Sequence, residues 1–90
     1  MPSYLVETYL ARGSTGERTA REQRARTAAE ALTRKRTQVR FAQSIHVLED
    51  ELCFFVFEAP SSTDAALAAQ LAGLDPIRVV EAISSPKEER

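Results

Sequence analysis

A run of six apolar residues at positions 52–57 (Leu-Cys-Phe-Phe-Val-Phe) constrains the fold of this chain more than any other feature. Its aromatic and β-branched content, with turn-forming residues after it, predicts a strand that is apolar on both faces. Such a strand belongs in the middle of a sheet, so both faces of that sheet need a cover. Because a chain of 90 residues has one small core, we expect a second copy of the chain to cover the face that its own helices leave open.

The rest of the hydrophobic pattern alternates between strand and helix periods. It predicts strands over residues 4–10, 39–47, 52–57 and 77–83 and helices over residues 17–35 and 65–72. This order is typical of the ferredoxin-like βαββαβ fold, an α+β domain with two helices on one face of a four-stranded antiparallel sheet in the order 4-1-3-2. We therefore expect a single domain over residues 1–84, followed by a flexible tail at residues 85–90.

Charge and cysteine content limit the classes of partner. Twelve basic against 13 acidic side chains give a net charge of −1, which argues against a dedicated nucleic-acid binder. The first predicted helix is nevertheless basic, at +4 against −5 for the rest of the chain, and we interpret it as a solvated helix face. A single cysteine excludes an internal disulfide, and no apolar run approaches the ~18 residues of a membrane span. We expect a cytoplasmic protein without a membrane partner.

Four segments carry a resemblance to a known family. They are Met-Pro-Ser-Tyr-Leu-Val-Glu at 1–7, Val-Arg-Phe-Ala-Gln-Ser-Ile at 39–45, Phe-Glu-Ala-Pro-Ser at 57–61 and Asp-Pro-Ile-Arg-Val-Val-Glu-Ala at 75–82. In their order and spacing the chain resembles a domain-of-unknown-function family of small ferredoxin-like dimers that includes a nickel-responsive, nickel-binding protein. The resemblance covers most of the chain. It implies a ferredoxin-like homodimer with a binding or accessory role, and nickel as the cofactor.

Two positions depart from the pattern of that family. Members often carry a histidine just before the serine of the second strand, where this chain has Gln43. They often carry a cysteine three residues before the Glu-Ala-Pro element, where this chain has Phe55. The single histidine and the single cysteine, His46 and Cys53, lie three and two residues away from these positions. We take His46 and Cys53 as the candidate metal ligands.

The hairpin between the second and third strands decides whether these two residues meet. With a two-residue loop at Glu49 and Asp50, His46 faces Cys53 across the strands, and imidazole and thiolate together suit nickel or zinc. With a three-residue loop, His46 lies on the opposite face from Cys53. We favour the three-residue loop because it gathers the apolar side chains on one face. That face would hold Val39, Phe41, Ile45, Val47, Cys53, Phe55 and Phe57.

Carboxylates inside the predicted strands suggest a polar site. Glu7, Glu58 and Glu81 lie in strands, where an unpaired half-buried charge is costly. One hypothesis is a cleft on the open sheet face, in which a carboxylate tunes the histidine for proton transfer. Its lining would be Glu7, Tyr9, Ser44, His46 and Glu58. The alternative is that each glutamate pairs with a basic residue such as Arg40 or Arg78 at the sheet rim or at a dimer seam.

A small enzyme is the alternative to a binding protein. Pro2 follows the first methionine, and removal of Met1 would expose a secondary amine of the kind that tautomerases use as a general base. The same strand order also occurs in cofactor-free dimeric α+β barrel oxygenases and cyclases, which bind organic substrates in a cleft. No catalytic motif in the chain identifies a reaction.

Overall fold

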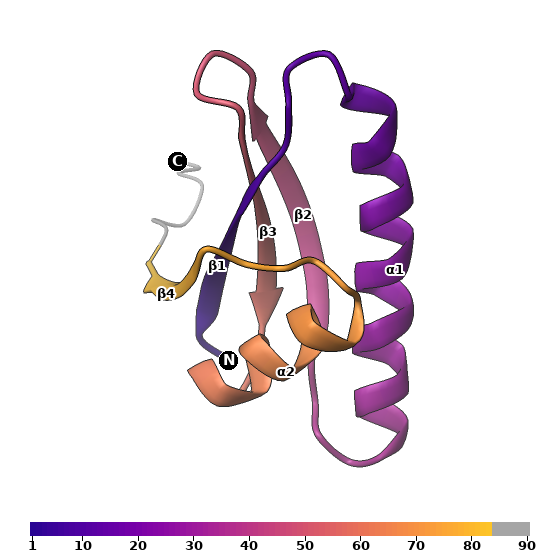
Figure 1. Cartoon of the computed structure of the whole chain (residues 1–90). Coiled ribbons are helices and arrows are strands. Elements are labelled where there is room, and N and C mark those ends of the chain that lie inside the picture. Colours follow the sequence, from indigo (N-terminus) through magenta and orange to yellow (C-terminus); the bar gives the residue numbers. More distant parts are fainter. Residues whose placement is uncertain (84–90) are drawn as a thin grey trace, which may run out of the picture.

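A computed structural model describes residues 1–83, and the predicted tail at residues 85–90 lies outside this described part. The elements are β1 (Ser3–Tyr9), α1 (Thr15–Arg34), β2 (Arg40–Val47), β3 (Leu52–Glu58), α2 (Ser62–Leu71) and β4 (Arg78–Ala82) (Figure 1). The strands form one antiparallel sheet in the order β2-β3-β1-β4. Read in reverse, this is the predicted order 4-1-3-2, so the ferredoxin-like fold is confirmed.

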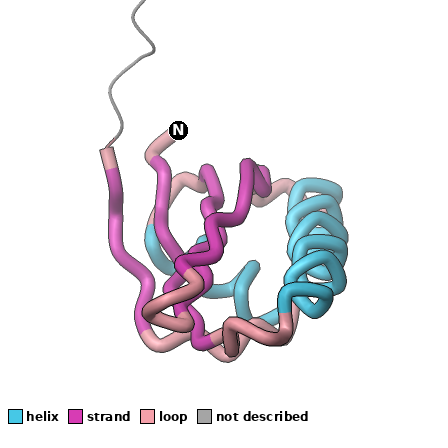
Figure 2. Tube along the Cα trace, turned by 90° about the horizontal axis from the view of Figure 1, so that it is seen from above, coloured by secondary structure: helices cyan, strands magenta, loops and turns pink. Residues whose placement is uncertain are grey.

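The core lies between one face of the sheet and both helices. Phe55 and Phe57 of the central strand β3 have no exposed surface, and the Phe41 ring of β2 packs 5.5 Å from the Phe57 ring, measured between centroids. The helices contribute mainly small side chains, which let their backbones approach the sheet closely. These are Ala25, Ala28, Ala29 and Leu32 of α1 and Ala65, Ala68 and Ala69 of α2. Figure 2 shows α1 beside the β2 edge of the sheet and β4 at the opposite edge.

Helix α1 is long because its interior contains good helix formers. Alanine and arginine dominate the segment after Gly16, and its buried positions recur three or four residues apart. The helix is followed by a tight turn in which Arg36 adopts a positive φ of 76° and Thr37 N donates to Leu32 O (2.9 Å). Within residues 1–83, no helix is both long and apolar enough to cross a membrane.

A β-bulge in β2 decides which side chains face the helices. Phe41 pairs with Phe57, but the pairing then skips Ala42 and continues with Gln43 opposite Val56. The extra residue reverses the alternation of faces along the strand. Phe41 therefore points into the core, whereas the apolar residues after the bulge, beginning with Ile45, lie on the open face of the sheet.

The hairpin register corrects one prediction. A backbone hydrogen bond of 3.2 Å closes a tight turn with Glu49 and Asp50 at its centre. This register places His46 directly opposite Cys53. The three-residue loop favoured from the sequence is wrong, and so is the single apolar face that it implied. The bulge at Ala42 explains the error, because it splits the apolar side chains of β2 between the two faces.

Candidate functional site

His46 lies on the helix-covered face of the sheet, near the beginning of α1. Its Nε2 atom donates to the carbonyl oxygen of Leu10 (3.0 Å). Because a carbonyl oxygen only accepts, the neutral ring carries its proton on Nε2 and a lone pair on Nδ1. The Nδ1 atom is buried and has no hydrogen-bond partner within the described residues. An unpaired buried nitrogen is unusual in a folded protein, and it marks His46 as a candidate ligand-binding side chain.

A small polar cluster surrounds this histidine. We call it the α1 cluster and define it as Arg18, Glu22, Ser44, His46 and Cys53. The Ser44 hydroxyl donates to the Glu22 carboxylate, and the Nε atom of Arg18 is buried without a hydrogen-bond partner among residues 1–83. Helix α1 and strands β2 and β3 thus bring a carboxylate, a guanidinium and an imidazole, all half-buried, to the margin of the core beside the buried thiol of Cys53.

The thiol of this cluster, on Cys53, has low nucleophilic reactivity. Cys53 has no exposed surface, and this burial raises the pKa of its thiol. Arg18 and Arg21 act in the opposite direction, because their positive charges favour the thiolate and lower its pKa. The net effect keeps Cys53 protonated at neutral pH. It is therefore poorly suited to act as a nucleophile.

The α1 cluster fits a metal only in part. His46 Nδ1 and Cys53 Sγ are chemically suited to nickel or zinc, and they come from directly paired residues. However, the part of the chain that the structure describes contains no group of three or more His, Cys, Asp or Glu side chains that could hold a metal ion. Protein sites for such ions usually have three or four protein ligands. The donors of one chain do not complete a nickel site.

The predicted polar cleft is not assembled. Glu7, Tyr9 and Glu58 face the open side of the sheet, while Ser44 and His46 face the helices. The bulge in β2 is again the cause, because it moves the even-numbered residues after Ala42 to the helix side. The carboxylates and the imidazole are therefore separated by the sheet itself.

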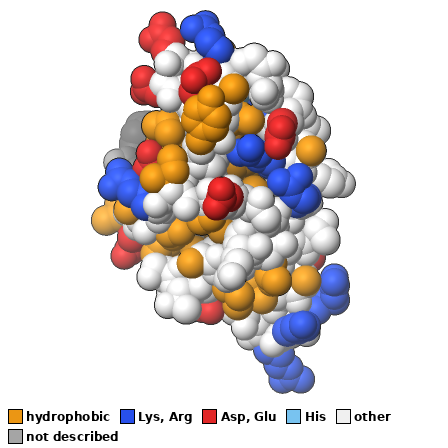
Figure 3. All heavy atoms as spheres, in the orientation of Figure 1, with side chains coloured by type: hydrophobic (Ala, Val, Ile, Leu, Met, Phe, Trp, Pro, Cys, Tyr) orange, Lys and Arg blue, Asp and Glu red, His pale blue; other side chains and the backbone are white. Residues whose placement is uncertain are grey.

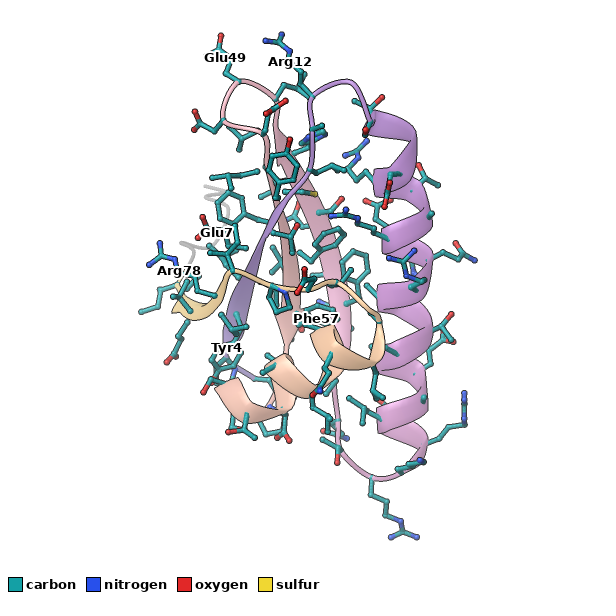
Figure 4. The ribbon with its side chains drawn as sticks, viewed as in Figure 1. Tyr4, Glu7, Arg12, Glu49, Phe57 and Arg78 are labelled. Atoms are coloured by element: carbon teal, nitrogen blue, oxygen red, sulfur yellow. The ribbon has the colours of Figure 1, made fainter. Side chains whose placement is uncertain are left out.

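Two of the three strand carboxylates form ion pairs instead. Arg78 Nε donates to Glu7 Oε1 (2.7 Å), and Figure 4 shows these two side chains directed toward each other from adjacent strands. Arg40 holds Glu58 with two hydrogen bonds of 2.9 and 2.8 Å. The third carboxylate, Glu81, is exposed. The alternative of rim ion pairs is thus confirmed for Glu7 and Glu58.

The pair between Arg40 and Glu58 predicts a pH dependence of stability. The hydrogen bonds from Arg40 hold the pKa of Glu58 below its ordinary value. The pair therefore stabilises the fold fully above the unfolded pKa of about 4.3, and the contribution is lost as the pH falls through the lowered folded pKa. We expect Glu58→Gln to make the free energy of unfolding slightly less dependent on pH at acid pH. Urea unfolding between about pH 3 and 6 measures this dependence. Glu81→Gln, which removes an exposed carboxylate, is the control, and equal effects of both variants would contradict the assignment.

The open face of the sheet is largely apolar. Its outward-facing apolar side chains are Leu5, Tyr9, Ile45, Val47, Leu52, Phe54, Val56 and Val80. Tyr9 is 57 % exposed and Ile45 is 45 % exposed. Among residues 1–83, no helix lies over this face, because both helices belong to the core on the other side. The two ion pairs described above also lie on this face, one at β2 and β3 and the other at β1 and β4.

Sequence reasoning missed two members of the α1 cluster. It treated the arginine-rich helix as a solvated face, yet Arg18 and Glu22 turn toward β2 and β3. Their spacing in the sequence could have indicated this orientation. They continue the buried row of Ala25 and Ala29 toward the start of the helix at intervals of three or four residues. Pro2, the other candidate from the sequence, is exposed at the start of β1, where its carbonyl oxygen accepts from Ala59 N (3.1 Å).

Comparisons with protein-family models, with curated proteins and with solved structures found no match to this chain.

Proposed function

We propose that this chain is a binding or accessory protein of the cytoplasm that works as a homodimer assembled through the open face of its sheet. The observation that carries the proposal is the apolar surface of that face, which crosses all four strands. Phe54 and Val56 of the central strand lie on it, while Phe55 and Phe57 fill the core on the other side. An apolar patch of this extent on a small protein is typical of a protein–protein interface.

A second copy of the chain suits this surface better than an unrelated partner. A two-fold axis places the same patch against itself, so an apolar face is automatically matched by an apolar face. The charges on the face are already paired, Glu7 with Arg78 and Glu58 with Arg40. Within residues 1–83, these two ion pairs therefore leave no set of like charges in the strands of this face that would repel an identical face. The resemblance to a family of ferredoxin-like dimers supports the same assembly.

The direct test is sedimentation velocity of the full chain over a range of concentrations. We expect twice the mass of one chain at micromolar concentration and dissociation on dilution. A single-chain mass at all concentrations up to about 100 μM would contradict the proposal, since specific interfaces of standard size usually hold at such concentrations.

Metal binding is a second candidate function, and the unpaired Nδ1 atom of His46 opposite Cys53 favours it. Because two protein donors make a weak site, we expect nickel or zinc to bind in the micromolar to submillimolar range, at roughly −5 to −8 kcal/mol. Calorimetric titration of the purified chain with each ion measures this directly. Cys53→Ser and His46→Gln are expected to remove the heat. No heat at submillimolar metal, or unchanged heat in both variants, would exclude the site.

A further inference from the structure

A groove of about 480 Å³ lies between the second half of α1 and the first residues of the edge strand β2. We call it the α1–β2 groove. Its lining consists of Arg26, Ala29, Glu30, Thr33, Arg34, Val39, Arg40 and Phe41. Two further hollows share Thr33 with it, so the surface around the end of α1 is hollowed over a wider area. A volume of this size is within the range of small-ligand sites.

The groove is basic, and two of its cations are free to bind a ligand. Within residues 1–83, neither Arg26 nor Arg34 has a carboxylate within ion-pair distance, whereas Arg40 is held by Glu58. Figure 3 shows Lys and Arg side chains gathered at the lower end of the molecule, where α1 finishes. The single acidic residue of the lining, Glu30, leaves a net positive charge.

Two residues of the lining, Arg26 and Phe41, are in cation–π contact. The guanidinium carbon of Arg26 lies 5.3 Å from the centroid of the Phe41 ring. Phe41 is only 8 % exposed, and Arg26 is exposed. The guanidinium thus lies over the aromatic ring in a cation–π contact and is open to solvent on its other side. A guanidinium in this position can stack on a further flat ring.

We propose that the α1–β2 groove binds a phosphate group joined to a flat heterocycle, as in a mononucleotide. Arg34 supplies donors for the phosphate oxygens, which guanidinium groups bind in a bidentate manner. Arg26 stacks on the heterocycle, and Ala29 and Val39 provide apolar contact beside it. The groove opens at the edge of the sheet, between helix and strand, and of its lining residues Arg40 alone, through its ion pair with Glu58, also belongs to the open face.

The test is calorimetric titration of the full chain with AMP, with adenosine and with inorganic phosphate. We expect AMP to bind with a dissociation constant below about 1 mM and at least about tenfold more tightly than either fragment, because only AMP uses both the stacking and the phosphate contacts. Arg34→Ala and Arg26→Ala are each expected to weaken AMP binding by about tenfold. The matched control is Arg12→Ala, which removes the same charge from an exposed loop at the other end of the molecule (Figure 4).

Three results would overturn the proposal. The first is the absence of AMP binding at millimolar concentration. The second is an equal loss in the Arg12→Ala variant, which would reveal unspecific attraction by the charged helix. The third is binding of a single-stranded oligonucleotide far more tightly than AMP, with a steep salt dependence, which would assign the groove to nucleic acid instead.

Discussion

Replacing Phe55 by alanine is expected to lower the free energy of unfolding by about 3–5 kcal/mol. Phe55 lies in the central strand β3, has no exposed surface and packs 6.2 Å from the Phe41 ring, measured between centroids. The alanine variant loses this buried apolar surface and leaves a cavity that the neighbouring backbone cannot fill. Urea unfolding followed by circular dichroism measures the loss.

The adjacent phenylalanine provides the matched control. Phe54 has the same side chain in the same strand but lies half-buried on the open face. At protein concentrations low enough to keep the chain monomeric, we expect Phe54→Ala to cost clearly less than Phe55→Ala. Equal losses would contradict the assignment of the two faces. If the alanine variant is unfolded in water, as a small domain with about 5 kcal/mol of stability allows, Phe55→Leu gives a smaller and measurable loss.

The fold could be predicted from the sequence because the hydrophobic pattern determines which segments form strands and helices and which strand lies in the middle of the sheet. The apolar run at residues 52–57 required a central strand, and the alanine row from Ala25 to Leu32 required a helix that packs closely on a sheet. Both features persist over enough residues to exclude alternatives. The element order then left one familiar arrangement of strands.

The register of β2 could not be predicted because a single residue decides it. Phe41 and Ile45 are both apolar and four residues apart, which in an uninterrupted strand places them on one face. The bulge at Ala42 places them on opposite faces, and no glycine or proline near this position indicates a bulge in the sequence. The error carried over to the candidate site, since it put His46 on the open face with Glu7 and divided it from Cys53.

The half-buried polar side chains of α1 could not be recognised from the composition of the helix. Arginine and glutamate are good helix formers on exposed faces, so Arg18 and Glu22 read as part of a solvated helix. Both side chains nevertheless turn toward the sheet: the Ser44 hydroxyl donates to the Glu22 carboxylate, and the Nε atom of Arg18 is buried without a hydrogen-bond partner among residues 1–83. Only the pairing of β2 with β3 shows that Ser44 lies on the helix side of the sheet.

Placing a charge on the open face is expected to dissociate the dimer. Ile45 is 45 % exposed in the single chain, so Ile45→Asp should disturb the fold of one chain little. In the proposed dimer the new carboxylate is buried against an apolar surface, and two-fold symmetry adds a second one. We expect the dissociation constant to rise by at least about 100-fold, equivalent to roughly 3 kcal/mol. Sedimentation velocity of wild type and variant at matched concentrations measures the change.

The control substitution makes the result specific to the open face. Leu71 on α2 is 56 % exposed, so Leu71→Asp introduces the same charge in place of a similar apolar side chain on the helix layer. We expect this variant to remain dimeric, because the helix layer lies on the other side of the sheet. Dissociation of Leu71→Asp with an intact Ile45→Asp dimer would move the interface to the helices. Circular dichroism of both variants confirms that the loss of mass reflects dissociation, since an unfolded chain would lose its helical signal.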